Sequence, residues 1–111
     1  MLPQLQENKM SDVDLEVKID ESIKIDIDEP KQYKVIFLND NNTPMEWVVG
    51  ILVEIFKHTD VTAKELMLTV HNEGSAVVGI YSYEIAEQKS AEAMGLSRHN
   101  GFPLQIRLEE E

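Results

Sequence analysis

The sequence predicts a small α+β sandwich with three strands and three helices in the order β-α-α-β-α-β. Three short runs rich in β-branched and aromatic residues indicate the strands. Apolar residues at helical spacing, preceded by capping residues, indicate the helices between them. The chain has 111 residues, of which 42% are hydrophobic, so it can form one modest core.

The first strand and the first helix are joined by a polar turn. Residues 33–38 (YKVIFL) predict a strand, and residues 39–42 (NDNN) predict a turn. Thr43 then has the pattern of an N-cap, with Pro44 in the first helical position and Glu46 completing a capping box. The apolar positions of this helix are Val48, Ile51, Leu52, Ile55 and Phe56.

The second helix is predicted to begin at another capping box, formed by Thr62 and Glu65, and to end at Gly74. Leu66, Met67 and Val70 share one face of this helix. Because the connection to the first helix is short, the two helices should form a hairpin over one face of the sheet.

The last three elements follow in quick succession. Residues 75–82 (SAVVGIYS) predict a strand, and Ser82 could cap a helix over residues 83–94 that is closed by Gly95. Residues 103–108 (PLQIRL) predict the last strand.

The charge divides the chain into two parts. Residues 1–30 hold nine Asp and Glu against three Lys, contain no aromatic residue and end in Asp-Glu-Pro. Such a composition favours a mobile segment. We therefore predict an acidic, mobile N-terminal extension over residues 1–31 and a core domain over residues 32–109.

Within the extension, apolar residues alternate with polar ones, which is the pattern of a strand. This alternation is either a chance pattern in an acidic tail or a conditional strand that pairs with a sheet edge or a partner. The residues are Val13, Leu15, Val17, Ile19, Ile23, Ile25 and Ile27.

The formal net charge of −11 argues against nucleic acid and against an anionic membrane surface as partners, because both are negatively charged. No apolar run is long enough to span a bilayer. The N-terminus lacks the pattern of a secretory signal, so we expect a cytoplasmic protein. The absence of Cys excludes disulfides and thiolate chemistry.

No catalytic group, cofactor or metal is predicted. The five Gly are scattered and form no phosphate-binding loop. His58, His71 and His99 lack the spacing of helical metal ligands. Two polar features remain: the turn at residues 39–42, which has more Asn and Asp than capping needs, and His71, which lies beside the apolar stripe of the second helix.

Four ordered blocks contain these features: NDNNTPMEWV, LMLTVHNEG, GIYSYEIAEQK and FPLQIRLE. In sequence and in spacing they resemble the ClpS adaptor family over about residues 32–109. The resemblance implies a three-stranded antiparallel sheet with three helices. It also implies an adaptor, not an enzyme, that binds N-degron substrates beginning with Leu, Phe, Tyr or Trp. Such adaptors deliver their substrates to the AAA+ unfoldase ClpA, which feeds the ClpP protease.

The resemblance also assigns residues to the α-amino group of the substrate. A free amine is a cation with three donors, and it needs fixed acceptors. The matching acceptors are Asn39, the residue two positions later, and His71. That later residue is Asn41, where the family usually has Asp, so amine binding should be kept but weakened. Asp40 could supply charge through a water molecule.

The side chain of the first substrate residue needs an apolar pocket. In the family, the residue that matches Met45 excludes β-branched first residues, a task that suits a flexible thioether. The matching pocket positions are Leu38, Thr43, Pro44, Met45, Val48, Met67, Val70 and Leu104.

The family's unfoldase-facing patch matches Glu84 and Lys89. We expect a monomer that binds a ClpA-type AAA+ unfoldase and N-degron peptides or proteins. Two alternatives remain. One is a divergent paralogue with narrower specificity because of Asn41. The other is a purely structural α+β interaction domain whose Asn-rich turn only caps a helix.

Overall fold

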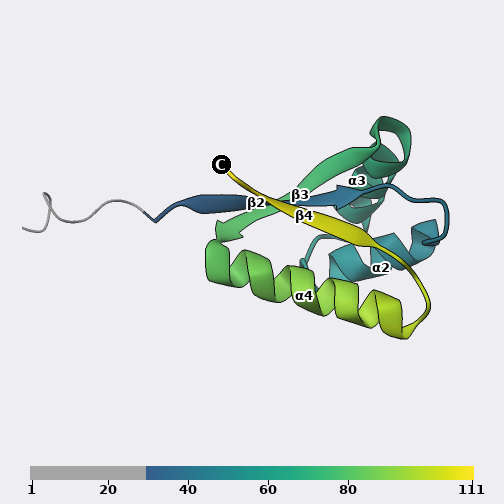
Figure 1. The fold of residues 1–111 in the computed structure, drawn as a ribbon. Helices are drawn as coiled ribbons and strands as arrows, with labels where there is room; N and C mark the ends of the chain where they lie inside the picture. The colour runs from purple at the N-terminus through teal and green to yellow at the C-terminus, as the bar shows by residue number, and fades with distance from the viewer. Residues whose placement is uncertain (1–29) are drawn as a thin grey trace, which may run out of the picture. The chain divides into compact units, whose positions relative to one another are not determined.

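The computed structural model describes residues 30–111. Residues 1–29 of the predicted extension, including the alternating stretch over residues 13–27, lie outside the described residues. The element order confirms the predicted fold class (Figure 1). The elements are β2 (Gln32–Leu38), α2 (Met45–Glu54), α3 (Asp60–Glu73), β3 (Ser75–Ser82), α4 (Tyr83–His99) and β4 (Gln105–Glu110).

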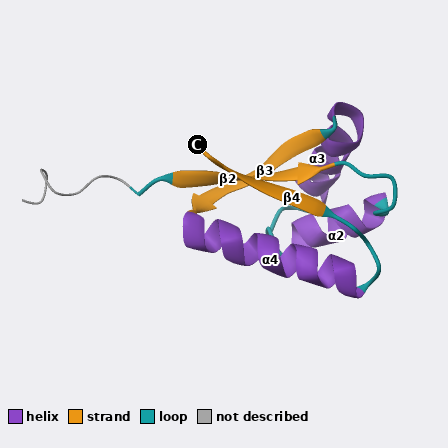
Figure 2. Ribbon diagram, viewed as in Figure 1, coloured by secondary structure: helices purple, strands orange, loops and turns teal. Residues whose placement is uncertain are grey.

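The three strands form one antiparallel sheet in the order β3-β2-β4 (Figure 2). β2 is therefore the central strand, and its last residue, Leu38, pairs with Ser75 of β3 and Gln105 of β4. The register between β2 and β3 shifts between Val35 and Ile36. The end of β2 is thus held on both sides before the chain leaves the sheet.

Helices pack against the face of β2 that displays Val35 and Phe37, both of which are fully buried. All five apolar residues that the sequence predicts for this helix are buried: Val48, Ile51 and Leu52 lie in α2, and Ile55 and Phe56 follow directly after it. The Phe37 and Phe56 rings meet edge to face with centroids 5.4 Å apart. α2 and α3 also pack against each other, while α4 contacts all three strands (Figure 2). Ala86 and Ala93 let α4 approach the sheet closely.

Both predicted capping boxes are wrong, and competing acceptors explain why. α2 begins at Met45 after Pro44, and the hydroxyl of Thr43 donates to the carboxylate of Asp40 instead of capping the helix. α3 begins at Asp60, because the hydroxyl of Thr59 accepts the backbone N–H of Thr62. The helix therefore starts two residues before the predicted cap.

The C-terminal helix and strand are present as predicted, but their first or last residues differ from the predicted ones. Ser82 precedes α4 as predicted, although its side chain forms no capping hydrogen bond. Gly95 does not end α4, which continues to His99 and turns at Gly101 (φ 84°). The last strand begins at Gln105, two residues later than predicted, and Leu104 is buried just before it.

Gly74 ends α3 in the left-handed region with φ 94°, as the sequence predicts. Replacing it with Ala should lower the free energy of unfolding by about 1 kcal/mol, because a Cβ disfavours this conformation. Gly50→Ala is the matched control. Gly50 lies inside α2, where an added Cβ meets nothing within 4 Å, so this substitution should raise stability slightly. Urea unfolding measures both, and equal effects would contradict the assignment.

Candidate functional site

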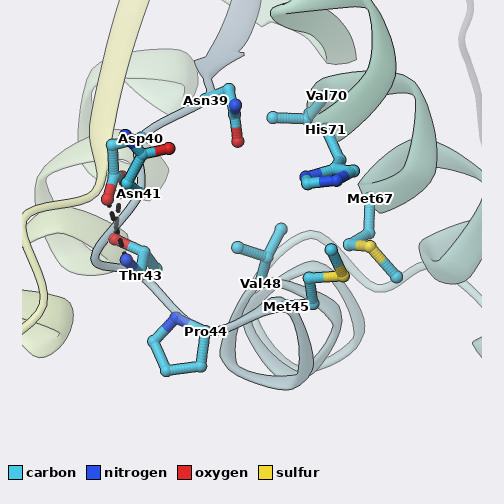
Figure 3. Close-up of a pocket in the computed structure, with 10 residues that line it drawn as sticks. All are labelled: Asn39, Asp40, Asn41, Thr43, Pro44, Met45, Val48, Met67, Val70 and His71. Atoms are coloured by element: carbon cyan, nitrogen blue, oxygen red, sulfur yellow. Dashed lines mark hydrogen bonds between the residues drawn. The ribbon is translucent and has the colours of Figure 1, made fainter.

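The loop after β2 is organised by one carboxylate. Asp40 Oδ1 accepts the backbone N–H groups of Asn42 (2.7 Å) and Thr43 (2.8 Å). Asp40 Oδ2 accepts the Thr43 hydroxyl at 2.8 Å (Figure 3). The polar loop is therefore a closed turn, and it enters α2 in a fixed direction.

A backbone hydrogen bond brings this loop to the end of α3. The N–H of Asn39 donates to the carbonyl of Gly74 at 2.9 Å, one step beyond the last β2–β3 pair. His71 lies three residues before Gly74, in the last turn of α3. The side chains of Asn39 and His71 consequently border the same space, although they are 32 positions apart in the sequence (Figure 3).

These elements enclose a cavity of about 270 Å³. Its polar wall comes from the loop and from the end of α3, and its apolar wall comes from α2 and α3 (Figure 3). The lining residues are Asn39, Asp40, Asn41, Thr43, Pro44, Met45, Val48, Met67, Val70 and His71.

The apolar wall has a firm base and a flexible rim. Val48 and Val70 are buried in the core, and Met67 is half-buried. Met45, in the first turn of α2, is 42% exposed. A thioether at the rim can change its rotamer at little cost, so the opening can adapt to what enters.

The polar wall offers acceptors with little net charge. Asn39 and Asn41 are exposed and present amide oxygens, while an unprotonated His71 presents a ring nitrogen. Asp40 is the one carboxylate in the lining, and both of its oxygens already accept hydrogen bonds from the loop. The cavity can thus hold a group with several N–H donors beside an apolar side chain.

Two further features are absent from the described part of the chain: a group of metal-binding side chains and a helix that could span a membrane. Residues 30–111 contain no group of three or more His, Asp or Glu side chains close enough to share an ion. In the same residues, no helix is long and apolar enough to cross a membrane.

Ten of the predicted site residues line this cavity, and four others do not. Leu104 is only 1% exposed and belongs to the core cluster, and Leu38 is not part of the cavity lining. Glu84 and Lys89 lie on α4, away from the lining.

Lys89 has a structural role that the sequence did not reveal. Its ammonium donates to the carbonyl of Ile55 at 2.9 Å, beyond the end of α2, and lies 5.4 Å from the centroid of the Tyr81 ring. Burial raises the pKa of the Tyr81 hydroxyl. Glu84, in contrast, is exposed in the first turn of α4.

The role of Asp40 in the turn was also missed, although the sequence contains a sign of it. An Asp followed by polar residues often accepts the backbone N–H groups two and three positions later. In DNNT (40–43), that pattern competes directly with the capping box that was predicted for Thr43.

The fold and this cavity define a small α+β domain with a cavity that is polar on one side and apolar on the other. The sequence profile of the family described as "ATP-dependent Clp protease adaptor protein ClpS" matches residues 28–107. The chain therefore belongs to the ClpS family, whose members are adaptors of the Clp protease.

Individual relatives agree with this assignment. The chain is 50% identical over 82 residues to the Clp protease adapter protein ClpS of Roseobacter denitrificans, covering 74% of this chain and 73% of the relative. It is 40% identical over 102 residues to ClpS 1 of Rhodopseudomonas palustris, covering 92% and 99%.

A solved structure also resembles this one. Agrobacterium tumefaciens ClpS2 bound to L-phenylalaninamide superposes with a TM-score of 0.73 at 43% sequence identity. The match covers 75% of this chain and all of the other. L-Phenylalaninamide, the ligand of that relative, has a free α-amino group and an aromatic side chain.

Asp40→Ala should lower the free energy of unfolding by about 1–2 kcal/mol, because three donors of the loop lose a charged acceptor. Asn42→Ala is the matched control, since Asn42 is exposed and only its backbone N–H is bonded to Asp40. Urea unfolding measures both variants. A change below about 0.5 kcal/mol in Asp40→Ala would show that the turn forms without the carboxylate.

Proposed function

We propose that this protein binds the first residue of N-degron substrates in the cavity and delivers these substrates to a ClpA-type unfoldase of the ClpAP protease. The observation that supports this most is the single cavity in which Asn39 and His71 face an apolar wall. The first residues expected are Leu, Phe, Tyr and Trp. The protein acts by binding alone, in the cytoplasm and as a monomer.

The polar wall distinguishes a chain terminus from an internal residue. An α-ammonium group has three N–H donors, and Asn39, Asn41 and His71 can supply acceptors around it. An internal peptide nitrogen has one donor and no charge, so it would leave acceptors without partners. Asp40 keeps the loop in place and adds a negative charge close to the ammonium.

The apolar wall selects the side chain. Burying a Leu or Phe side chain contributes about 1.5–3 kcal/mol, which alone gives only weak binding. Contacts to the amine must supply the remainder. Met45, half-exposed at the rim, restricts branching close to the backbone, so Ile and Val should be excluded.

Asn41 supports a second candidate, a ClpS-like paralogue with narrower specificity. A neutral amide binds an ammonium more weakly than a carboxylate does, by roughly 1 kcal/mol. The side-chain pocket must then contribute a larger share of the affinity. The affinity for substrates whose side chains fill the pocket poorly would then be too low for capture.

The N-terminal part of α4 is the proposed contact with the unfoldase. Glu84 is flanked by Tyr83 and Ile85, which are 47% and 41% exposed. Exposed apolar side chains beside a charge are typical of a protein interface. Lys89 contributes mainly by anchoring α4 to Ile55, so Glu84 is the cleaner residue to test.

The degron site is tested by fluorescence anisotropy with a labelled peptide that begins with Phe. N-acetylation of the peptide, or Ile in first place, should lower its affinity by at least about tenfold. Asn39→Ala and His71→Ala should each lower it by about tenfold. Both side chains are exposed, so these variants should keep the stability of the parent protein.

Asn41→Asp separates the two candidates. An adaptor of the usual specificity already binds Leu-first and Phe-first peptides, and this variant should improve both by about fivefold. A narrowed paralogue should bind Leu-first peptides only after the substitution. Equal binding of acetylated and free peptides would reject both candidates in favour of a structural domain.

Glu84→Arg should weaken binding to a ClpA-type unfoldase by about fivefold or more, because it reverses a charge inside the proposed interface. Its affinity for phenylalaninamide should stay unchanged, since Glu84 lies outside the cavity. Glu65→Arg, an exposed substitution on α3, is the matched control. Surface plasmon resonance with immobilised unfoldase measures all three proteins. Unchanged binding by Glu84→Arg would move the interface elsewhere.

A further inference from the structure

A second groove lies between α2 and α4 and encloses about 170 Å³. It is on a different face of α2 from Met45 and Val48, the two residues of this helix that line the degron cavity. Most of the surface that it offers is apolar. The lining residues are Glu46, Trp47, Gly50, Ile51, Glu54 and Leu96.

Contacts within the chain hold the walls of this groove in place. The Trp47 indole N–H donates to the Ser97 hydroxyl at 2.8 Å, and the Trp47 and Phe102 rings pack with centroids 5.1 Å apart. Leu96 forms the opposite wall and is 44% exposed. At Gly50, an added Cβ would meet nothing within 4 Å, so the backbone of α2 is uncovered there.

A carboxylate stands at each end of the uncovered backbone. Glu46, Gly50 and Glu54 follow one another at intervals of four residues, so they share one stripe of α2. The backbone positions of Glu46 and Glu54 are about 12 Å apart along the helix axis, from the rise of about 1.5 Å per residue. Within residues 30–111, neither carboxylate forms an ion pair with Lys, Arg or His.

We propose that this groove binds a basic amphipathic helix of a partner protein. One apolar side chain of that helix lies over Gly50 and against Leu96. A Lys or Arg four residues before it and another four residues after it pair with Glu46 and Glu54. A helix alongside α2 has the same rise per residue, so cations eight residues apart match the spacing of the carboxylates. The bare backbone at Gly50 lets the helix approach closely.

Charge disfavours the other occupants. The chain's own first 30 residues hold nine acidic residues against three Lys, so the carboxylates would repel them. A symmetric contact with a second copy would place the Glu46–Glu54 stripe against the same stripe of its partner. A helix with an apolar side chain between two cations would match both the apolar lining of the groove and the carboxylates of Glu46 and Glu54.

The probe is an N-acetylated, alanine-based helical peptide of about 18 residues with the pattern Lys-x3-Leu-x3-Lys, long enough to populate a helix. Acetylation prevents it from entering the degron cavity through its amine. Trp47 is the only Trp of the chain and lines the groove, so its fluorescence reports binding. We expect a saturable change that weakens as salt increases. A twin peptide with Glu in place of both Lys should cause none.

Variants of the full-length protein locate the site. Gly50→Leu fills the groove and should abolish binding of the Lys peptide, and Glu54→Lys should weaken it by about fivefold or more. Gly95→Leu on α4 and Glu65→Lys on α3 are the matched controls, since an added Cβ at Gly95 also meets nothing and Glu65 is exposed elsewhere. Phenylalaninamide binding should be unchanged in all four variants.

Three results would overturn the proposal. The first is equal binding of the Lys peptide and its Glu twin. The second is Lys-peptide binding that survives both Gly50→Leu and Glu54→Lys. The third is a Trp47 signal that follows protein concentration and not the peptide, which would assign the groove to contact between copies of the chain.

Discussion

One hydrogen bond determines the geometry of the site, the one from the Asn39 N–H to the Gly74 carbonyl. It extends the pairing of β2 and β3 beyond Leu38 and Ser75, and it exists because Gly74 adopts a left-handed conformation at the end of α3. The last turn of α3, and with it His71, is thereby fixed beside the residue that leaves the sheet. Sheet pairing thus aligns two acceptors that are far apart in the sequence, and no side chain needs to hold them together.

Hydrogen bonds hold the polar wall of the cavity in place, whereas flexible side chains form part of the apolar wall, and this difference suits the proposed ligand, a protein N-terminus. The α-amino group is the same in every substrate, so its acceptors benefit from the rigid turn around Asp40. The side chain varies among substrates, and the wall that receives it includes the flexible Met45 and Met67. Under the proposed function, firmly held acceptors would give selectivity for a free terminus, and adaptable thioethers would widen the set of side chains that fit.

The sequence predicted the helices and strands well, because the spacing of apolar residues such as Val48, Leu52 and Val70 marks the face of each element that packs in the core. It predicted their starts poorly where several side chains compete for the same donors. Thr43, Thr59 and Thr62 all fit a capping pattern, and only the folded chain shows that Asp40 binds the first and that Thr59 caps α3. The cavity residues followed from resemblance, because periodicity alone cannot place Asn39 beside His71 or move Leu104 into the core.

Helical periodicity also explains how α2 can serve two surfaces. Met45 and Val48 line the first cavity, while Glu46, Gly50 and Glu54 follow a stripe on another face of α2. The helix is anchored by Ile51 and Leu52 in the core and by the Trp47–Ser97 hydrogen bond to α4. A partner bound in the groove therefore need not displace a bound terminus. The proposed contact at Glu84 lies at the other end of α4 from Leu96, three helical turns away along the chain. In the proposed function, the adaptor holds its cargo while it contacts other proteins, and the separate faces of α2 and α4 would allow this without a conformational change.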